Sequence, residues 1–394
     1  MRKFIHAFLI LVIIIGVLNL CDLYSGYKLS LGVDRVFTTE ENTIEATHKQ
    51  EAKNEENLNN YLYRHMDERD KKTYNTIYNA VLGFKTPVFI GYFEDVQDAF
   101  DIFKIVMSEH PELFWCTGQC SFGAGGFLNI DYAYSKSEAM EKKKLIEEKT
   151  DEFIAGLDGD EYTKALACYE YVILNTCYDM ENLDRILEVP EDSSIEGVFL
   201  KNTAVCAGYA KAYQYLLQKA GLTAMYVVGV GSNSSGSENH AWIIQQIDGK
   251  YYYSDPTWDD TKNDKLVCHS YFCITAGEIT VNHEIDELYP LLTANSLEAN
   301  YFVRENRYFD EYSVSDVRKV IADSLEQNQD FVEFRYKTQD EYEKAKERLF
   351  QEGEIYIAFK PTDFLKYSVN TEKITLIKDD VHRVIMLIYN KDNN

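Results

Sequence analysis

The spacing of hydrophobic side chains predicts a helix over residues 206–220. Thr203 or Asn202 would be a suitable N-cap for this helix, and Gly221 is suited to end it. Cys206 then lies in the first turn, where unpaired backbone N–H groups and the helix dipole favour a thiolate over a thiol. The apolar side chains recur every three or four positions and form one stripe, made of Tyr209, Tyr213, Leu216, Leu217 and Ala220.

The pattern after this helix predicts a β-hairpin with strands at residues 240–244 and 251–255. Between them, Asp248-Gly249 is a dipeptide typical of two-residue hairpin turns. With that turn, His240 lies diagonal to Asp255 at roughly 7–8 Å between backbones. We therefore expect the two side chains to be within hydrogen-bonding reach of each other.

Cys206, His240 and Asp255 together supply the attacking sulfur, base and orienting carboxylate of a thiol nucleophile. In this interpretation Asp255 fixes the tautomer of His240 and supports its positive charge. His240 exchanges a proton with Cys206, whose sulfur attacks a carboxamide carbon. Water in a hydrolase, or an amine in a transferase, then resolves the thioester. Backbone N–H groups at the helix start, including that of Cys206, are the expected oxyanion donors, with a side chain that the sequence does not identify.

Each of the three residues also has a purely structural interpretation. A cysteine on an amphipathic helix is often a small core residue, and a histidine beside an apolar run is often a buried core histidine. An aspartate before proline often starts a turn. The ordered spacing favours the triad, because three structural explanations would have to coincide at intervals of 34 residues (240 − 206) and 15 residues (255 − 240).

Zinc binding is the next alternative, because His269 and His283 flank Cys268 and Cys273. Neither the Cys-x2-Cys nor the His-x3-His spacing of zinc sites occurs in the sequence. His283 is expected in a loop that follows a strand at residues 271–275. The sequence thus predicts neither a metal nor a cofactor.

The motifs around the three candidate residues resemble the bacterial transglutaminase-like superfamily. They are Val-Cys-Ala-Gly-Tyr-Ala-Lys-Ala, His-Ala-Trp and Tyr-Tyr-Tyr-Ser-Asp-Pro-Thr-Trp-Asp-Asp, within a resemblance that covers about residues 160–285. The resemblance implies an α+β, papain-like core in which the helix bearing Cys206 packs on an antiparallel sheet bearing His240 and Asp255. It also implies that these three residues are the catalytic ones. The sequence His-Ala-Trp-Ile-Ile departs from the commoner His-Ala-Trp-Asn next to the histidine.

The resemblance indicates the mechanism better than it indicates the substrate, because the family includes transferases, proteases, amidases and inactive relatives. Our hypothesis is a transglutaminase-like cysteine enzyme that acts on peptide or protein amide bonds at the cell surface. A hydrolytic peptidase or amidase without crosslinking activity is one alternative. A non-catalytic surface binding module is the other, and the complete triad argues against it.

Other patterns complete a catalytic domain that we place at residues 76–300. The aromatic residues of His110–Trp115 are expected to pack on the core, and the small polar residues 229–239 predict a mobile loop before His240. Upstream of the cysteine we expect a helix at 96–109, a strand at 126–134 and a long charged helix at 137–157.

After residue 300 the pattern changes to that of a small α/β sandwich domain, residues 301–394, without a catalytic constellation of its own. The expected elements are a strand at 301–304, a helix at 314–328, a strand at 331–336, a helix at 338–351, a strand at 355–360, and later strands near 374–377 and 384–388.

The amino terminus predicts attachment to a membrane. Arg2 and Lys3 precede the apolar run Phe4–Leu20, which has no clean small-residue cleavage site. We expect residues 1–22 to be an uncleaved single-pass anchor with the catalytic domain outside the cell; secretion after signal cleavage is the alternative. Residues 23–75 are expected to be a charged spacer that becomes helical toward its end.

The net charge bears on the partners of the protein, and the cysteine count bears on its disulfides. The formal net charge of −25 argues against nucleic acid and anionic polymers, and is more compatible with a basic or neutral peptide substrate. The 8 cysteines among 394 residues do not identify a disulfide scaffold, and free buried thiols are the simplest expectation.

Overall fold

The computed structural model describes residues 56–182, 188–261, 266–359 and 369–391. The chain divides into two units, Met1–Lys53 and Asn54–Asn394, of which the first lies outside the described residues. The predicted anchor at residues 1–22 and most of the predicted spacer therefore lie there as well. The described part is α+β, as the sequence predicts.

An antiparallel sheet with strand order β8-β7-β6-β9 forms the centre of the fold. The β7–β8 hairpin has the predicted register, with Ile247 opposite Lys250 and Ile243 opposite Ser254. Asp248 and Gly249 form its turn, and both have the positive φ that this kind of turn requires. The strands are β6 (Thr223–Asn233), β7 (Gly236–Ile247), β8 (Lys250–Ser254) and β9 (His283–Ile285).

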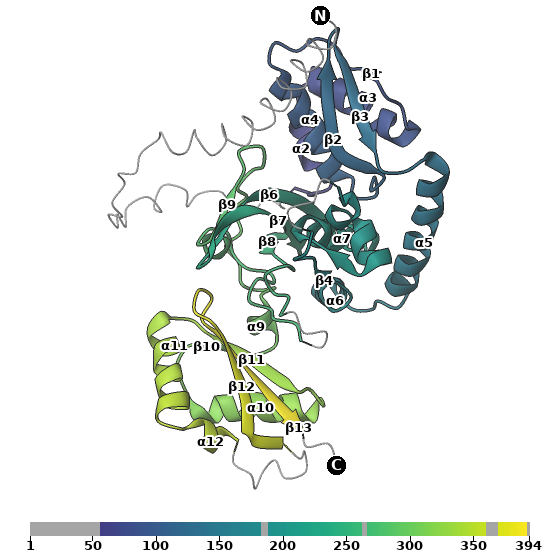
Figure 1. Ribbon diagram of the computed structural model, residues 1–394. Helices are drawn as coiled ribbons and strands as arrows, with labels where there is room; N and C mark the ends of the chain where they lie inside the picture. The colour runs from purple at the N-terminus through teal and green to yellow at the C-terminus, as the bar shows by residue number, and fades with distance from the viewer. Residues whose placement is uncertain (1–55, 183–187, 262–265, 360–368, 392–394) are drawn as a thin grey trace, which may run out of the picture. The chain divides into compact units, whose positions relative to one another are not determined.

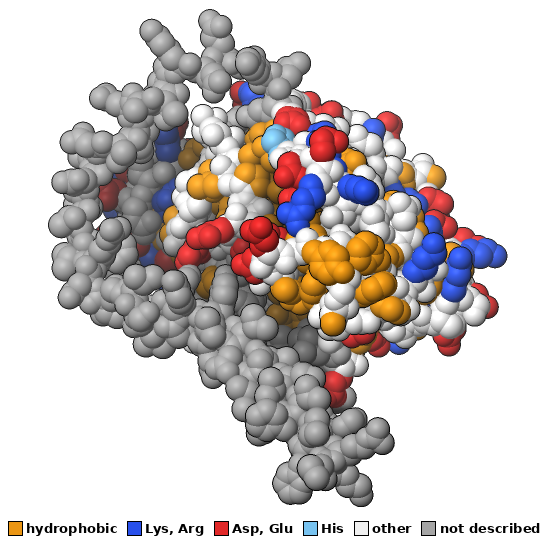
Figure 2. All heavy atoms as spheres, turned by 90° about the horizontal axis from the view of Figure 1, so that it is seen from above, with side chains coloured by type: hydrophobic (Ala, Val, Ile, Leu, Met, Phe, Trp, Pro, Cys, Tyr) orange, Lys and Arg blue, Asp and Glu red, His pale blue; other side chains and the backbone are white. Residues whose placement is uncertain are grey.

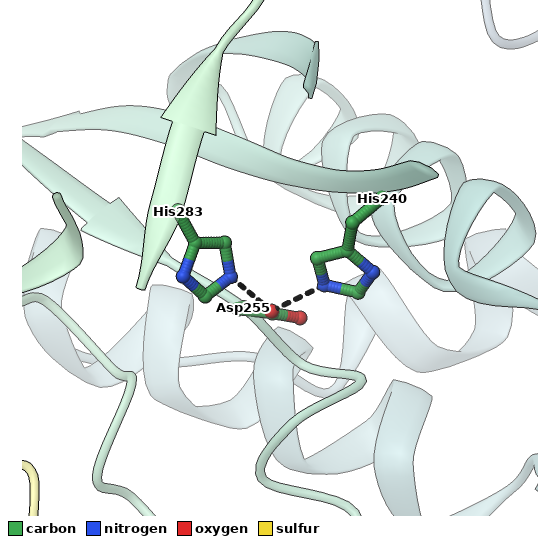
Figure 3. A group of neighbouring side chains, drawn as sticks. All are labelled: His240, Asp255 and His283. Carbon is green, nitrogen blue, oxygen red and sulfur yellow. Dashed lines mark hydrogen bonds and ion pairs between the residues drawn. The ribbon is translucent and has the colours of Figure 1, made fainter. Parts of the chain in front are cut away.

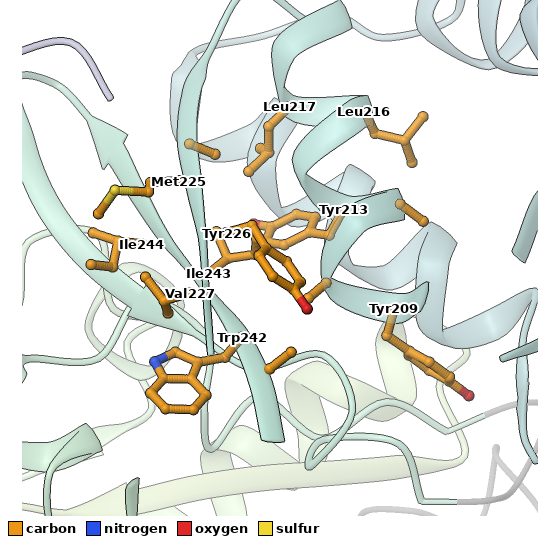
Figure 4. Close-up of a cluster of buried hydrophobic side chains, with 14 of the residues drawn as sticks. Tyr209, Tyr213, Leu216, Leu217, Met225, Tyr226, Val227, Trp242, Ile243 and Ile244 are labelled. Atoms are coloured by element: carbon orange, nitrogen blue, oxygen red, sulfur yellow. The ribbon is translucent and has the colours of Figure 1, made fainter. Parts of the chain in front are cut away.

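Helix α7 (Cys206–Lys219) packs on strands β6 and β7 (Figure 1). The predicted stripe is the buried face, and Figure 4 shows it beside the hydrophobic side chains of the sheet. Fully burying one such side chain stabilises a fold by roughly 1.5–3 kcal/mol. Figure 4 labels Tyr209, Tyr213, Leu216 and Leu217 of the helix, and Met225, Tyr226, Val227, Trp242, Ile243 and Ile244 of the sheet; of these sheet residues, Tyr226 and Ile243 lie on the face toward the helix.

The predicted N-cap of this helix is wrong. Val205 occupies the N-cap position without a side-chain cap, because Thr203 belongs to the short strand β5 (Thr203–Ala204) and Asn202 has left-handed backbone angles. Strand β5 pairs in parallel with β4 (Cys177–Tyr178), so the chain is extended up to the start of the helix. Gly221, with φ 82°, follows the helix end as predicted.

The region predicted as a mobile loop, residues 229–239, is instead a hairpin. Strands β6 and β7 remain paired out to Asn233 and Gly236, so the backbone groups of this polar segment bond to each other. Composition alone favours a loop here, and strand pairing overrides that tendency.

The ordered body begins earlier than the predicted boundary between residues 75 and 76. That boundary falls inside helix α3 (Glu68–Gly83), which buries Tyr74 and Ile77, and Leu58 and Leu62 also belong to the core. These apolar side chains lie among many charges, and so the segment resembles a solvated spacer in sequence.

The predicted helices at 96–109 and 137–157 and the predicted strand at 126–134 agree closely with α4, α5 and β3. The predicted strand at 271–275 is wrong, because these residues contribute only an isolated bridge from Ile274 to Tyr253. Trp115 and Phe114 are buried in the core, as expected for the 110–115 segment. The strands β1, β2 and β3 form a sheet of order β1-β3-β2. The bounds are α2 (Tyr61–His65), β1 (Val88–Phe89), α4 (Val96–Glu109), β2 (Cys116–Gly123), β3 (Phe127–Tyr132), α5 (Lys136–Ala155), α6 (Glu161–Leu174) and α8 (Ala276–Ile279).

The C-terminal region has a sheet of order β10-β11-β13-β12 with its own hydrophobic core. Two predicted strands are wrong, because residues 301–304 and 355–358 are short helices. In the second, Ile355 and Ala358 are buried while Tyr356 and Ile357 are exposed, which is helical spacing. The bounds are α9 (Tyr301–Arg304), β10 (Tyr308–Phe309), α10 (Val314–Glu326), β11 (Phe331–Tyr336), α11 (Gln339–Lys346), α12 (Ile355–Ala358), β12 (Val369–Asp379) and β13 (Val384–Lys391).

The surface carries hydrophobic side chains among charged ones (Figure 2). Phe89, Tyr92 and Phe127 are exposed, and the ring of Phe89 contacts both of the others, with centroids 6.2 and 5.4 Å apart. Among the described residues, no helix is long and apolar enough to cross a membrane. The cysteines of the described part, Cys206 included, are free thiols.

Candidate active site

Cys206 is the first residue of α7 and is half-buried. The chain reaches it through an extended segment fixed by the hydrogen bond from Val205 N–H to the Asp192 carbonyl, 3.0 Å. Because the side chain of Val205 offers no cap, the positive end of the helix is available to a negative charge at the sulfur.

His240 on β7 and Asp255, directly after β8, form a buried pair. The distance from His240 Nε2 to Asp255 Oδ2 is 2.6 Å, and the residues are 3% and 0% exposed. His240 also forms a side-chain hydrogen bond with Cys206. Since Nε2 faces the carboxylate, Nδ1 is the ring nitrogen left for the sulfur. The structure thus brings together all three residues that the sequence singles out.

The pKa of His240 reflects these two partners. Burial would lower it, but the Asp255 carboxylate and the Cys206 sulfur raise the pKa of His240 to about 10. A histidine with such a pKa is positively charged at neutral pH, so an imidazolium faces the Cys206 sulfur.

The Asp255 carboxylate is held by its own turn as well as by His240. Its Oδ1 accepts hydrogen bonds from the backbone N–H groups of Thr257, 2.9 Å, and Trp258, 3.3 Å. Burial would raise the pKa of Asp255, but the neighbouring histidines hold it well below its usual range. The carboxylate is therefore ionised and fixed in orientation.

A second histidine contacts the same carboxylate. His283 on β9 lies with Nε2 at 3.1 Å from Asp255 Oδ2, so that the two rings flank the carboxyl group (Figure 3). The expected loop position is wrong: His283 is the buried first residue of a short strand paired with β6. Sequence reasoning missed this contact because β9 is only three residues long and has no alternating pattern.

Aromatic rings pack against both histidines. The ring centroid of Trp258 lies 5.3 Å from that of His240 and 4.4 Å from that of His283. Trp242 contacts His283 from another side, with centroids 4.8 Å apart. These contacts strengthen the electrostatic interaction with Asp255, since the local dielectric is low.

Tyr178 lies beside the nucleophile. Its strand β4 pairs with β5, which places Tyr178 opposite Ala204, and its hydroxyl group accepts a hydrogen bond from the Cys206 backbone N–H. Burial and the nearby Cys206 sulfur raise the pKa of Tyr178, so the hydroxyl keeps its proton. A hydroxyl donor and a backbone donor therefore meet next to the sulfur.

Residues 148–256 match the family model of the transglutaminase-like superfamily. The chain contains a transglutaminase-like core. Cys206, His240 and Asp255 all lie inside the matched segment, whereas His283 lies beyond its end. Members of this superfamily are typically cysteine-based enzymes.

Solved structures with similar regions share little sequence with this chain. A structure of a TGase is 20% identical, covering 35% of this chain and 43% of that one, with a TM-score of 0.27. A candidate cysteine protease from Cytophaga hutchinsonii is 20% identical over 32% of this chain and 40% of that one, with a TM-score of 0.24. The periplasmic domain of TgpA from Pseudomonas aeruginosa, bound to ethylmercury, is 21% identical over 29% of this chain and 43% of that one, with a TM-score of 0.21. The match spans less than half the length of each of these proteins. No curated protein matches the chain.

The group formed by His240, Asp255 and His283 is poorly suited to bind a metal ion. Ligand atoms of His240, Asp255 and His283 lie within 4.8 Å of one another. Both histidines nevertheless approach the same carboxylate oxygen at hydrogen-bond distances, 2.6 and 3.1 Å, which leaves no room for an ion between them. The arrangement is that of a hydrogen-bonded set.

The residues considered for zinc have other partners. His269 is buried between the carboxylates of Glu333 and Glu170, and Cys273 accepts a hydrogen bond from Gln245 Nε2, 2.8 Å. Within the described residues these side chains do not converge with His283 on a common metal-binding group.

Proposed function

We propose that the chain is a transglutaminase-like cysteine enzyme that acts on peptide or protein amides through Cys206, His240 and Asp255. The observation that carries this proposal is the buried 2.6 Å pair of His240 and Asp255, with the Cys206 sulfur hydrogen-bonded to the same imidazole. A core histidine with a structural role has no need of a nucleophile at the start of a helix on one side and a buried carboxylate on the other.

The proposed reaction begins with attack of the Cys206 sulfur on the amide carbon, which forms a carbon–sulfur bond and moves the carbonyl electron pair onto oxygen. As this pair returns, the carbon–nitrogen bond breaks, and His240 gives its proton to the departing amine. The product is a thioester. Water or a second amine then attacks the thioester carbon and loses a proton to His240, and the Cys206 sulfur leaves.

We propose Tyr178 as the side chain that completes the oxyanion site. Its hydroxyl group lies beside the Cys206 backbone N–H, the donor expected from the sequence. Both can donate to the negative oxygen of the tetrahedral intermediate once substrate displaces the contact between them.

We also propose that the enzyme works outside the cell, attached to the membrane through residues 4–20. The apolar run behind Arg2 and Lys3 supports this proposal. Protease treatment of intact cells tests it: an exported domain is degraded, whereas a domain inside the cell is protected.

The decisive experiment compares the wild type with Cys206→Ala on a set of glutamine-containing peptides, with and without an added primary amine. Acid quenching and intact mass measurement would show the acyl group on Cys206 in the wild type alone. Free acid or cleaved peptide indicates hydrolysis, and a peptide carrying the amine indicates transfer.

The matched control is Cys120→Ala, which removes another partly exposed free thiol and should leave turnover unchanged. Turnover that persists in a folded Cys206→Ala variant would overturn the proposed function.

A further inference from the structure

His283 lies opposite His240 across the Asp255 carboxylate, and its side chain is fully buried (Figure 3). It lies beyond residue 256, where the match to the superfamily ends. The catalytic steps above assign no chemistry to it. Burial of an imidazole costs free energy unless its ring nitrogens are hydrogen-bonded, so the partners of His283 call for an explanation.

The neighbours of His283 decide where its proton lies. Nδ1 is 2.8 Å from Asn282 Oδ1, and Asn282 Nδ2 is 2.7 Å from the Tyr271 hydroxyl. In this orientation both ring nitrogens face oxygen acceptors, which a neutral imidazole with one N–H cannot satisfy. Turning the Asn282 amide by 180° resolves the conflict. Tyr271 then donates to Asn282, Asn282 donates to Nδ1, and Nε2–H donates to Asp255.

Charge at the site favours this neutral form. Burial lowers the pKa of His283, and the electrostatic interactions with His240 and His382 lower it further, against the opposing effect of Asp255. His240 is on β7, His382 lies between β12 and β13, and Glu284 follows His283 on β9 itself. With His240 already charged, a second imidazolium on the same carboxylate would be repelled by the first.

The fold holds the His283 ring in place. Strand β9 pairs with β6 at Gly229 and Gly231, where a side chain would collide: a Cβ on Gly229 would lie 2.0 Å from the Glu284 carbonyl oxygen. Trp242 and Trp258 pack against the ring. The glycines of β6 allow β9 to approach closely, and the two indole rings hold the imidazole in place. The Nε2–H group of His283 is therefore directed toward Asp255.

We propose that His283 is a positioning residue that donates from Nε2–H to Asp255 Oδ2, orients the carboxylate on His240, and limits how tightly His240 holds its proton. This inference rests on the proposed function. Without the second donor, the full negative charge of Oδ2 acts on His240. The imidazolium then gives up its proton less readily to the leaving amine.

The test compares His283→Gln, which keeps a donor near the position of Nε2, with His283→Leu, which removes it. His283→Leu should lower kcat roughly tenfold with little change in KM; a tenfold change corresponds to about 1.4 kcal/mol, the scale of a single hydrogen bond. It should also move the alkaline limb of the pH profile to higher pH. His283→Gln should restore both to within about twofold of the wild type. Equal losses in both variants with an unmoved pH profile would overturn the proposal, as would unchanged kinetics in folded His283→Leu.

Nitrogen NMR of ¹⁵N-histidine-labelled wild-type protein provides a measurement that needs neither activity nor a leucine variant that folds. The proposal requires a neutral His283 with its proton on Nε2 at pH 7. A proton on Nδ1, or an imidazolium, would overturn it. These spectra judge this inference alone, because they report the proton of His283 without turnover; the proposed function is judged separately by the acyl group on Cys206.

Discussion

At the scale of single residues, Asp255 connects the parts of the site. Its carboxylate joins His240 of β7 to His283 of β9, and its backbone carbonyl accepts a hydrogen bond from Tyr169 of α6, 2.8 Å. Sequence spacing predicts the pairing with His240, because a two-residue turn fixes the register. The contact with His283 joins residues 28 positions apart in the sequence, and no local pattern encodes it.

Removal of the Tyr178 hydroxyl should affect turnover but not thiol reactivity. Tyr178→Phe should lower kcat for amide substrates by about 10²–10³-fold, the usual cost of losing one oxyanion donor. Alkylation of Cys206 by iodoacetamide should proceed at the wild-type rate, because that displacement creates no oxyanion. Steady-state kinetics and alkylation rates measured together check this.

Tyr132→Phe is the matched control, since its hydroxyl bonds to the carbonyls of Ala80 and Lys85, in another part of the fold. Equal losses of alkylation and turnover in Tyr178→Phe would mean that the residue supports the structure and not the oxyanion.

At the scale of elements, predictions succeed where local pattern and tertiary pairing agree. The helix of Cys206 has a continuous apolar stripe, and the β7–β8 hairpin has a strong turn signal, so both have the predicted boundaries to within one residue or a few. The four-residue segments at 301 and 355 fail because aromatic and branched side chains favour strands locally, while burial selects helices. Strand pairing likewise decides residues 229–239.

Gly229 should be required for the close approach of β9. Gly229→Ala would place a methyl group 2.0 Å from the Glu284 carbonyl oxygen and 2.8 Å from the Trp242 ring. We expect a loss of about 1–3 kcal/mol in the free energy of unfolding, typical of overpacking, together with weakened His283 contact. Chemical denaturation and the alkylation pH profile measure the two effects.

Gly277→Ala is the control at this scale, because a Cβ there meets nothing within 4 Å and the φ angle is not positive. Wild-type stability in Gly229→Ala would contradict the packing argument.

At the scale of the whole described molecule, a buried ion pair links the core to the C-terminal region. His269 donates its backbone N–H to Glu333 of β11, 3.2 Å, its ring bonds the Glu333 and Glu170 carboxylates, and it stacks on Tyr301 with centroids 3.8 Å apart. Composition predicts a separate small domain after residue 300. It gives no indication of this link, because the partners are 64 residues apart and each looks like a surface charge in sequence.

The stability contributed by His269 should depend on pH in a defined direction. Burial would lower its pKa, but Glu333 and Glu170 raise the pKa of His269 to about 10. Because this value lies above the ordinary one near 6.5, the contribution is fully present below about pH 6.5 and is lost as pH rises through about 10. His269→Phe, which keeps a ring on Tyr301 but leaves Glu333 buried without its cation, should cost about 3–5 kcal/mol at neutral pH.

Denaturant unfolding at pH 6, 8 and 10 measures the free energy of unfolding of both proteins. The difference in this free energy between wild type and His269→Phe should shrink at the highest pH. Lys337→Ala, which removes an exposed pair with Asp310, should change nothing measurable. A difference that is the same at all three pH values would exclude the charged pair as its source.

The proposed chemistry requires an activated sulfur at Cys206, and the pH dependence of Cys206 alkylation tests this requirement. Iodoacetamide modification of Cys206, read by mass spectrometry from pH 5 to 10, should be fast and nearly constant from about pH 6 to 9 in the wild type, because the His240 imidazolium persists over this range. In His240→Ala the rate should be slow at pH 6 and rise toward about pH 8.5, as for an ordinary thiol. Slow modification with the same pH dependence in both proteins would contradict the nucleophile assignment and leave a transglutaminase-like core without its proposed chemistry.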